Sequence, residues 1–120
     1  MNQNKLNGQK GEEIAVGHLR SKGYTIKGRN IKVGYREIDI LATKGEFLIV
    51  VEVKWRSSAY FCFPEEGLSA RQQRNLIEAA DEYVKKINWN GPVRFDVIAI
   101  IQTKLERRIL HIEEAFWPFF

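Results

Sequence analysis

With 120 residues, 44% of them hydrophobic and 28% charged, the chain has the composition of a globular protein and room for one domain, so we expect residues 1–120 to form a single unit. No apolar run approaches the roughly 20 residues that span a bilayer, and the N-terminus lacks an apolar signal segment, so we expect a cytoplasmic protein without a membrane partner. The net charge of +4 mildly favours a polyanionic partner, and the single cysteine, Cys62, excludes an internal disulfide.

The first half of the chain predicts one helix followed by three strands. Apolar residues at helical spacing indicate a helix over Gly8–Lys22, and Gly23 is a normal residue at a helix end. The three strands are expected at Tyr24–Arg29, Arg36–Thr43 and Phe47–Trp55. The turn Lys44-Gly45-Glu46 between two apolar runs predicts that the last two strands form an antiparallel hairpin.

The second half predicts one more helix and two more strands. Ser69 and Gln72 have the spacing of a capping box at the start of the helix, and its apolar stripe continues to Ile87. The two strands are expected at Val93–Gln102 and Arg108–Ile112. The order α-β-β-β-α-β-β predicts an α/β fold with a mixed sheet flanked by helices.

Two charged residues interrupt an apolar strand. The unbroken apolar run Phe47–Val51 predicts a central strand that is buried on both faces, yet Glu52 and Lys54 follow it on one face. A buried charge is costly unless it is paired, hydrogen-bonded or bound to a metal. For these two residues alone, an internal ion pair is the simpler interpretation.

Asp39 changes that interpretation, because it too lies among apolar residues, in the strand that precedes Phe47. Carboxylates without imidazole or thiolate suit Mg²⁺ or Mn²⁺, and we expect Asp39, Glu52 and the Val53 backbone carbonyl to be the metal ligands. Lys54 beside them can orient a water molecule or neutralise charge on a phosphate. The two carboxylates should then lie roughly 4–6 Å apart.

Two further acids have open alternatives. Glu12 lies on the face of the first helix that packs on the sheet, where it either joins the site or complements the helix dipole. Glu37 shares a strand face with Asp39 and is either a metal ligand or the ion-pair partner of Arg29 or Arg36.

Seven short motifs stand in order along the chain: Gly8-x-x-Gly11-Glu12-x-x-Ala15-x-x-x-Leu19, Gly23-Tyr24, Arg29-Asn30, Glu37-Ile38-Asp39-Ile40, Val51-Glu52-Val53-Lys54-x-Arg56, Arg94-Phe95-Asp96-Val97, and His111-Ile112 with Ala115-Phe116. Together they resemble the YraN family of small bacterial proteins, which is related to Holliday-junction resolvases and other PD-(D/E)XK nucleases. The resemblance implies a restriction-endonuclease-like fold and a catalytic set of Glu12, Asp39, Glu52 and Lys54. The chain departs from the family pattern at Arg36, where a glycine is usual, and at Gln72, where a lysine is usual.

Four arginines are the predicted nucleic-acid contacts: Arg36, Arg56, Arg71 and Arg74. The last two occupy the first turns of a helix, where the dipole disfavours cations unless an anion such as phosphate binds there. An ordinary solvated surface is the alternative. His111 and Trp55 are interpreted as structural.

The sequence therefore predicts an Mg²⁺- or Mn²⁺-dependent, endonuclease-like phosphodiesterase whose partner is nucleic acid, with DNA, including branched DNA, as the expected substrate. Two alternatives stay open. One is a non-catalytic nucleic-acid-binding module on the same fold. The other is a protein-interaction domain that uses the aromatic C-terminus, residues 116–120, which we expect to dock on the fold or on a second subunit of a homodimer.

Overall fold

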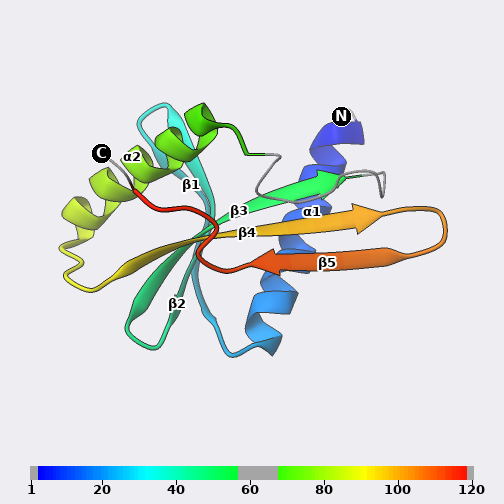
Figure 1. The fold of residues 1–120 in the computed structure, drawn as a ribbon, viewed down its shortest axis with the longest axis horizontal. Coiled ribbons are helices and arrows are strands. Elements are labelled where there is room, and N and C mark those ends of the chain that lie inside the picture. The colour runs from blue at the N-terminus through cyan, green and yellow to red at the C-terminus, as the bar shows by residue number, and fades with distance from the viewer. Residues whose placement is uncertain (1–2, 57–67, 119–120) are drawn as a thin grey trace.

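The structure is a computed structural model that describes residues 3–56 and 68–118, with side chains from residue 8 onward. Within these residues the chain forms two helices and five strands (Figure 1). They are α1 (Gln3–Ser21), β1 (Thr25–Val33), β2 (Arg36–Lys44), β3 (Phe47–Arg56), α2 (Ala70–Ile87), β4 (Val93–Gln102) and β5 (Arg107–Ile112). This order and the mixed sheet confirm the predicted α/β, restriction-endonuclease-like fold.

The sheet has the strand order β1-β2-β3-β4-β5. Its two N-terminal connections are antiparallel hairpins with two-residue turns, Gly34-Tyr35 between β1 and β2 and Gly45-Glu46 between β2 and β3. Gly34 and Gly45 have φ values of 64° and 59°, which an L side chain adopts with difficulty. β3 and β4 are parallel, which requires the longer crossover that contains α2.

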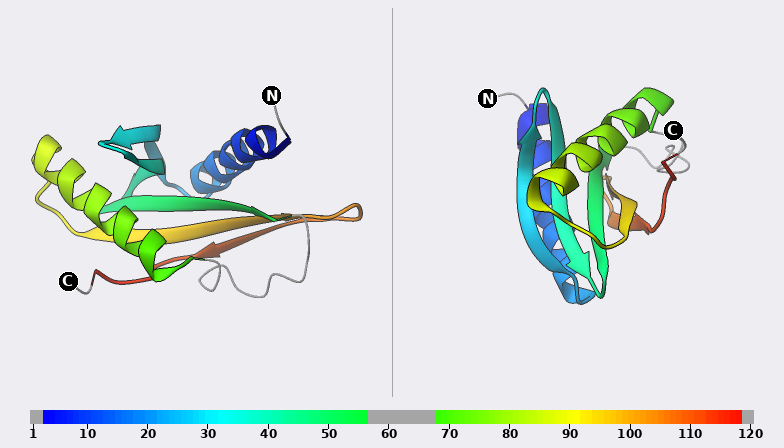
Figure 2. Two further views of the ribbon diagram at one scale, coloured as in Figure 1. Left: turned by 90° about the horizontal axis from the view of Figure 1, so that it is seen from above. Right: turned by 90° about the vertical axis from the view of Figure 1, so that its left-hand side faces the viewer.

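Each helix covers one face of the sheet. Figure 1 shows α1 behind the sheet, and the view from above in Figure 2 places the start of α2 on the opposite side. α1 packs through Ala15, Val16 and Leu19 against alternate residues of β2, β3 and β4. α2 packs through Leu76, Ile77 and Ala80 against the other set of strand residues. Both faces of the central strands are therefore buried, as their apolar runs predict.

The predicted capping box at the start of α2 is confirmed. The Ser69 hydroxyl accepts a hydrogen bond from the Gln72 N–H at 3.1 Å, and the Gln72 side-chain oxygen accepts one from the Ser69 N–H at 2.8 Å. The helix ends at Asn88, which adopts the left-handed conformation with φ 57°.

Element boundaries differ from the prediction by more than one residue at two places. α1 begins at Gln3 rather than Gly8. β1 continues to Val33 rather than ending at Arg29, because the Gly34-Tyr35 turn carries it into a long hairpin with β2.

The strand β2 is irregular around Asp39. Ile38 packs on the α2 side of the sheet, whereas Ile40 packs on the α1 side, although residues two apart in a regular strand share a face. The residue opposite Asp39 on β1 is Asn30, whose φ of 50° is left-handed. The regular two-residue alternation of the strand therefore breaks at this one position.

Candidate active site

The strands β2 and β3 part at Asp39. Their pairing extends from the Gly45-Glu46 turn only as far as Ile40 and Val51. The second half of β3 therefore pairs with β4 and not with β2. The Val53 N–H donates to the Asp39 carboxylate at 2.9 Å across this opening. Because the N–H and C=O of one strand residue face the same neighbouring strand, the Val53 carbonyl faces the opening as well.

The carboxyl groups of Asp39 and Glu52 lie close enough to interact, and each affects the pKa of the other. Burial raises the pKa of Glu52 to about 8, and the negative charge and hydrogen bond of Asp39 add to this effect. Burial also raises the pKa of Asp39, although less than it would without the hydrogen bonds from Val53 and Glu52. The raised pKa of Glu52 therefore favours its protonated form at neutral pH.

Glu12 and Glu37 bring two more acids to the opening. One carboxylate oxygen each from Glu12, Glu37 and Asp39 lie within 4.8 Å of one another. Burial and the charge of Asp39 raise the pKa of Glu12, and its contact with Arg29, at 3.9 Å, only partly offsets them. The acids thus come from α1, β2 and β3 and meet where the sheet opens.

Gly11 sets the position of Glu12. A Cβ atom at Gly11 would stand 3.3 Å from the Trp55 ring and 3.7 Å from Val53 on β3, so a larger residue would push α1 away from the sheet. The helix therefore lies close to β3 and delivers the next residue, Glu12, to the acids. Trp55 packs with the α1 side of the core, as expected.

Lys54 lies beside the acids, with its Nζ 3.9 Å from a Glu52 oxygen and its side chain 15% exposed. This distance is at the outer limit of an ion pair, and the proton on Glu52 weakens the attraction further. An internal Glu52–Lys54 ion pair therefore explains little of the arrangement, which is governed by the acids.

Glu37 pairs with neither of the arginines proposed for it. It contacts Lys32 at 2.8 Å, with its side chain 36% exposed, while Arg29 contacts Glu12 and Arg36 contacts Glu78 of α2. Sequence reasoning named Glu37 only as an alternative ligand, and the structure places it in the acid cluster.

The proton on Glu52 gives a pH prediction. Its folded-state pKa of about 8 lies above its ordinary value of 4.5, so the folded state keeps a proton that the unfolded state releases between these values. The free energy of unfolding should fall as pH rises from about 5 to 8, by a few kcal/mol at most. Glu52→Gln, which is neutral at every pH, should remove most of this dependence. Urea unfolding in a chelator across this pH range measures it, and parallel curves for the two proteins would contradict it.

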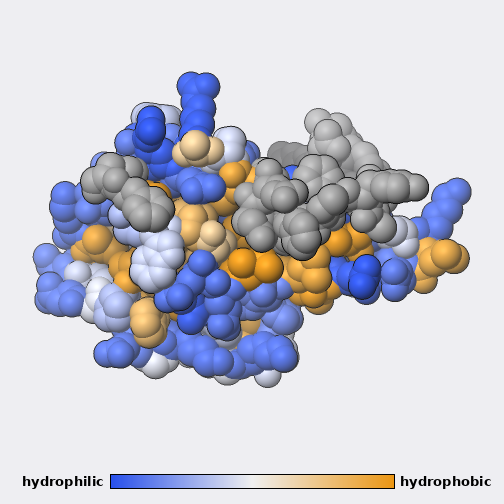
Figure 3. Space-filling model, in the orientation of Figure 1, coloured by the Kyte–Doolittle hydropathy of each residue, from blue (hydrophilic) through white to orange (hydrophobic). Residues whose placement is uncertain are grey.

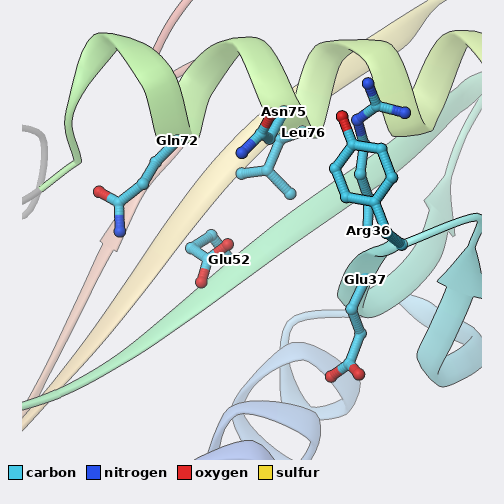
Figure 4. A pocket seen from close by; sticks show the side chains of 7 residues that line it. Arg36, Glu37, Glu52, Gln72, Asn75 and Leu76 are labelled. Carbon is cyan, nitrogen blue, oxygen red and sulfur yellow. The ribbon is translucent and has the colours of Figure 1, made fainter.

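The four predicted arginines have different surroundings. The Arg36 guanidinium forms an ion pair with Glu78, and Arg56 donates a hydrogen bond to the Trp55 carbonyl at 3.1 Å. Arg71 and Arg74 are exposed on α2. Gln72, Asn75 and Leu76 are the α2 residues that line the cleft beside Glu52 (Figure 4). Arg74 follows Gln72 by two positions, which places the two side chains about 200° apart around the helix axis. The structure therefore does not bring Arg74 to the cleft. The roles of all four arginines stay predictions.

Comparison with known proteins identifies the family. Residues 11–100 match the model of the uncharacterised protein family UPF0102. UPF0102 proteins of Bacteroides thetaiotaomicron and Porphyromonas gingivalis are 43% and 44% identical to the chain, each over 111 residues, which cover 92% and 91% of this chain and 92% and 82% of theirs. One of Thermodesulfovibrio yellowstonii is 41% identical over 110 residues, which cover 92% of this chain and 95% of its own. The chain belongs to the UPF0102 family. This is the YraN family, so the resemblance is confirmed.

A second polar cluster of the UPF0102 chain is buried on the α1 side of β4. Asp96, whose side chain is fully buried, accepts two hydrogen bonds from Arg94 at 2.8 Å each and contacts the His111 ring at 2.8 Å. The Glu114 N–H donates to it at 3.2 Å, and Arg94 also donates to the Tyr24 hydroxyl at 2.7 Å. His111 thus has the expected structural role. The signal that sequence reasoning did not use was Asp96 itself, an acid inside the apolar strand Phe95–Ile101.

The C-terminal segment of the UPF0102 chain docks in part. Phe116 is buried and stacks on Phe95 with 5.1 Å between ring centres, while Trp117 is exposed. Cys62, Phe119 and Phe120 lie outside the described residues.

Within the part of the chain that the structure describes, neither helix is long and apolar enough to cross a membrane. In Figure 3 apolar side chains gather in a band across the middle of the face that carries β4 and β5. The expected homodimer stays a prediction.

Proposed function

We propose that this UPF0102 protein is a metal-dependent phosphodiesterase that acts on nucleic acid, with DNA as the expected substrate. The observation that carries the proposal is the meeting of four acids, Glu12, Glu37, Asp39 and Glu52, with Lys54 beside them at one opening of the sheet. Burial raises the pKa values of Glu12, Asp39 and Glu52, and perturbed pKa values in a cluster of acids are typical of a functional site.

The donor atoms suit a hard divalent cation. They are carboxylate oxygens and a backbone carbonyl, the ligands that Mg²⁺ and Mn²⁺ prefer over the nitrogen and sulfur ligands of zinc. Asp39, Glu52 and the Val53 carbonyl would hold the ion, and Glu12 and Glu37 would complete the shell directly or through water. The bound ion would polarise the phosphoryl oxygen and offset the negative charge of the acids.

Lys54 supports the proposal because it supplies a positive charge beside the acids. Its ammonium group, largely shielded from solvent, can donate a hydrogen bond to an attacking water and orient it toward the phosphorus atom. The same charge stabilises the extra negative charge that builds up on the phosphate oxygens in the transition state. Low exposure strengthens both effects, because the surrounding water is reduced.

A cleavage assay tests the proposal. Labelled linear and branched DNA is incubated with the protein in Mn²⁺, in Mg²⁺ and in a chelator, and in parallel with the variant Lys54→Ala. We expect cleavage with either metal, none in the chelator, and a loss of at least about 100-fold in the variant. Lys85→Ala, which changes an exposed lysine of α2, is the control and should keep full activity.

Two results would contradict the proposal. Wild-type protein that binds DNA without cleaving it under any of these conditions would leave the non-catalytic binding module. Equal cleavage by wild type and Lys54→Ala would point to a contaminating nuclease.

A further inference from the structure

A cleft adjoins the acids on the side of the sheet that faces α2 (Figure 4). Its volume is about 260 Å³, and Glu52 forms part of its wall. The remaining wall comes from Tyr35 in the β1–β2 turn, from Arg36 and Glu37 at the start of β2, and from Gln72, Asn75 and Leu76 of α2. Pockets for drug-sized ligands begin at about 300 Å³. The cleft therefore has room for a small group that is attached to something outside it.

Tyr35 provides an aromatic surface at the rim. It stands at the tip of the β1–β2 hairpin and is 83% exposed. The Arg36 guanidinium covers one side of its ring at 4.4 Å. A large aromatic side chain has few rotatable bonds, so it loses little conformational freedom when another flat group stacks on it. The turn thus holds a stacking surface next to the acids.

The cleft also presents polar groups without partners. Among the described residues, the Asn75 side-chain amide makes no hydrogen bond, and Gln72 uses only its side-chain oxygen, in the capping box, which leaves its amide N–H groups available. Both amides line the cleft, so a ligand with in-plane donors and acceptors would bond to them on entering it.

One ligand class meets all of these requirements. A nucleobase is flat, stacks on aromatic rings and carries donors and acceptors along its edge, which asparagine and glutamine amides and arginine recognise. Leu76 adds an apolar contact for the base plane. The acids next to the cleft are where the phosphate of the same strand would lie.

We propose that this cleft binds a single unstacked nucleobase, with Tyr35 as the stacking residue and Asn75 as a residue that contacts the base edge. The proposal rests on the proposed function and specifies its substrate class: a nucleic acid with an unpaired or easily unstacked nucleotide next to the phosphate at the acids. A continuous duplex has to extrude a base to fill the cleft, which costs unstacking free energy.

Equilibrium binding tests the proposal without cleavage. Fluorescence anisotropy measures the affinity for a labelled DNA duplex that contains one unpaired base and for the same duplex fully paired, in Ca²⁺. We expect tighter binding of the unpaired substrate. Tyr35→Ala should weaken that binding roughly tenfold and leave the paired duplex nearly unchanged, whereas Tyr35→Phe should keep the preference. Trp117→Ala, which changes another exposed aromatic, is the control.

A base-identity series tests the edge contact. Asn75→Ala should reduce the difference in affinity among duplexes that carry A, G, C or T at the unpaired position. It should change the average affinity less than Tyr35→Ala does.

Each outcome supports or overturns the proposal. Equal weakening of both substrates by Tyr35→Ala would mean a general contact and would overturn it, while cleavage in the assay above would leave the proposed function intact. A preference that depends on Tyr35 without any cleavage would support the base site and overturn the nuclease. A wild-type protein that binds neither DNA would overturn both.

Discussion

Asp96→Ala is expected to destabilise the protein by about 3–5 kcal/mol, because removal of one partner from a buried ion pair leaves the other charge uncompensated. The side chain of Asp96 is fully buried, and that of Arg94 is 13% exposed. The substitution removes the two hydrogen bonds that this guanidinium donates to Asp96, and it leaves the His111 ring and the Glu114 N–H without this acceptor. Urea unfolding at pH 7 measures the loss.

Asp81→Ala is the matched control. Asp81 forms an ion pair with Lys85 at 2.9 Å, but both side chains are more than half exposed, at 61% and 74%. Such a pair contributes roughly 0.3–0.5 kcal/mol. Losses of similar size in the two variants would contradict the view that the Asp96 cluster fastens β4 to the C-terminal segment.

The Asp96 cluster also has a pH signature. Burial alone would raise the pKa of Asp96, but hydrogen bonds from His111 and Arg94 outweigh it and lower the pKa below its ordinary value of 3.8. For a carboxyl with a lowered folded-state pKa, the stabilisation is complete above the unfolded value and is lost as pH falls toward the folded value. The stability difference between wild type and Asp96→Asn should therefore be constant from pH 7 to about 4 and shrink below that.

The element order was predictable because its signals are local. The Lys44-Gly45-Glu46 turn, the Ser69–Gln72 capping box and the long apolar runs each specify one element without reference to the rest of the fold. The extension of β1 to Val33 was not predicted. Ile31 and Val33 alternate there with polar residues and pair with Ile38 and Arg36 of β2, a pattern that the prediction did not use.

The acids of the site were predictable for a different reason. Asp39, Glu52 and Lys54 interrupt apolar strands, and a charge in such a place needs a special explanation. Their meeting point was not predictable, because it depends on the place where β2 parts from β3. That parting lets Glu12 from the α1 side and Glu52 from the α2 side reach one opening, which a strand with regular alternation would prevent.

The surroundings of the site depend on helix phase. The place of Arg71 and Arg74 in the first turns of α2 favoured them as phosphate contacts. The rotation of α2, which is set by the packing of Leu76, Ile77 and Ala80, turns Gln72 and Asn75 toward the cleft. Likewise, Arg36 was expected to meet phosphate, and its guanidinium contacts Glu78 across the α2 interface. Side-chain partners of this kind follow from tertiary packing and leave no pattern in the sequence.

Asp39→Asn is expected to abolish the stabilisation of the protein by Mn²⁺ while leaving the metal-free protein as stable as wild type or more so. The acids repel one another, and burial and this repulsion raise the pKa of Glu12 and Glu52. An asparagine relieves the repulsion and can still accept the hydrogen bond from the Val53 N–H. It cannot offer the negative charge that a hard cation requires.

Thermal melts at pH 7 decide between a metal site and an acid cluster without one. A cation that binds only the folded state stabilises it by about 2.7 kcal/mol at 100 times its Kd, which corresponds to a rise in Tm of roughly 10 °C for a domain of this size. Wild type and the control Asp81→Asn should show this rise with Mn²⁺, and Asp39→Asn should not. A rise of equal size in all three proteins would place the ion elsewhere. If none of them responds, Glu52 shares its proton with Asp39 for structural reasons alone, and the acid cluster does not bind Mn²⁺.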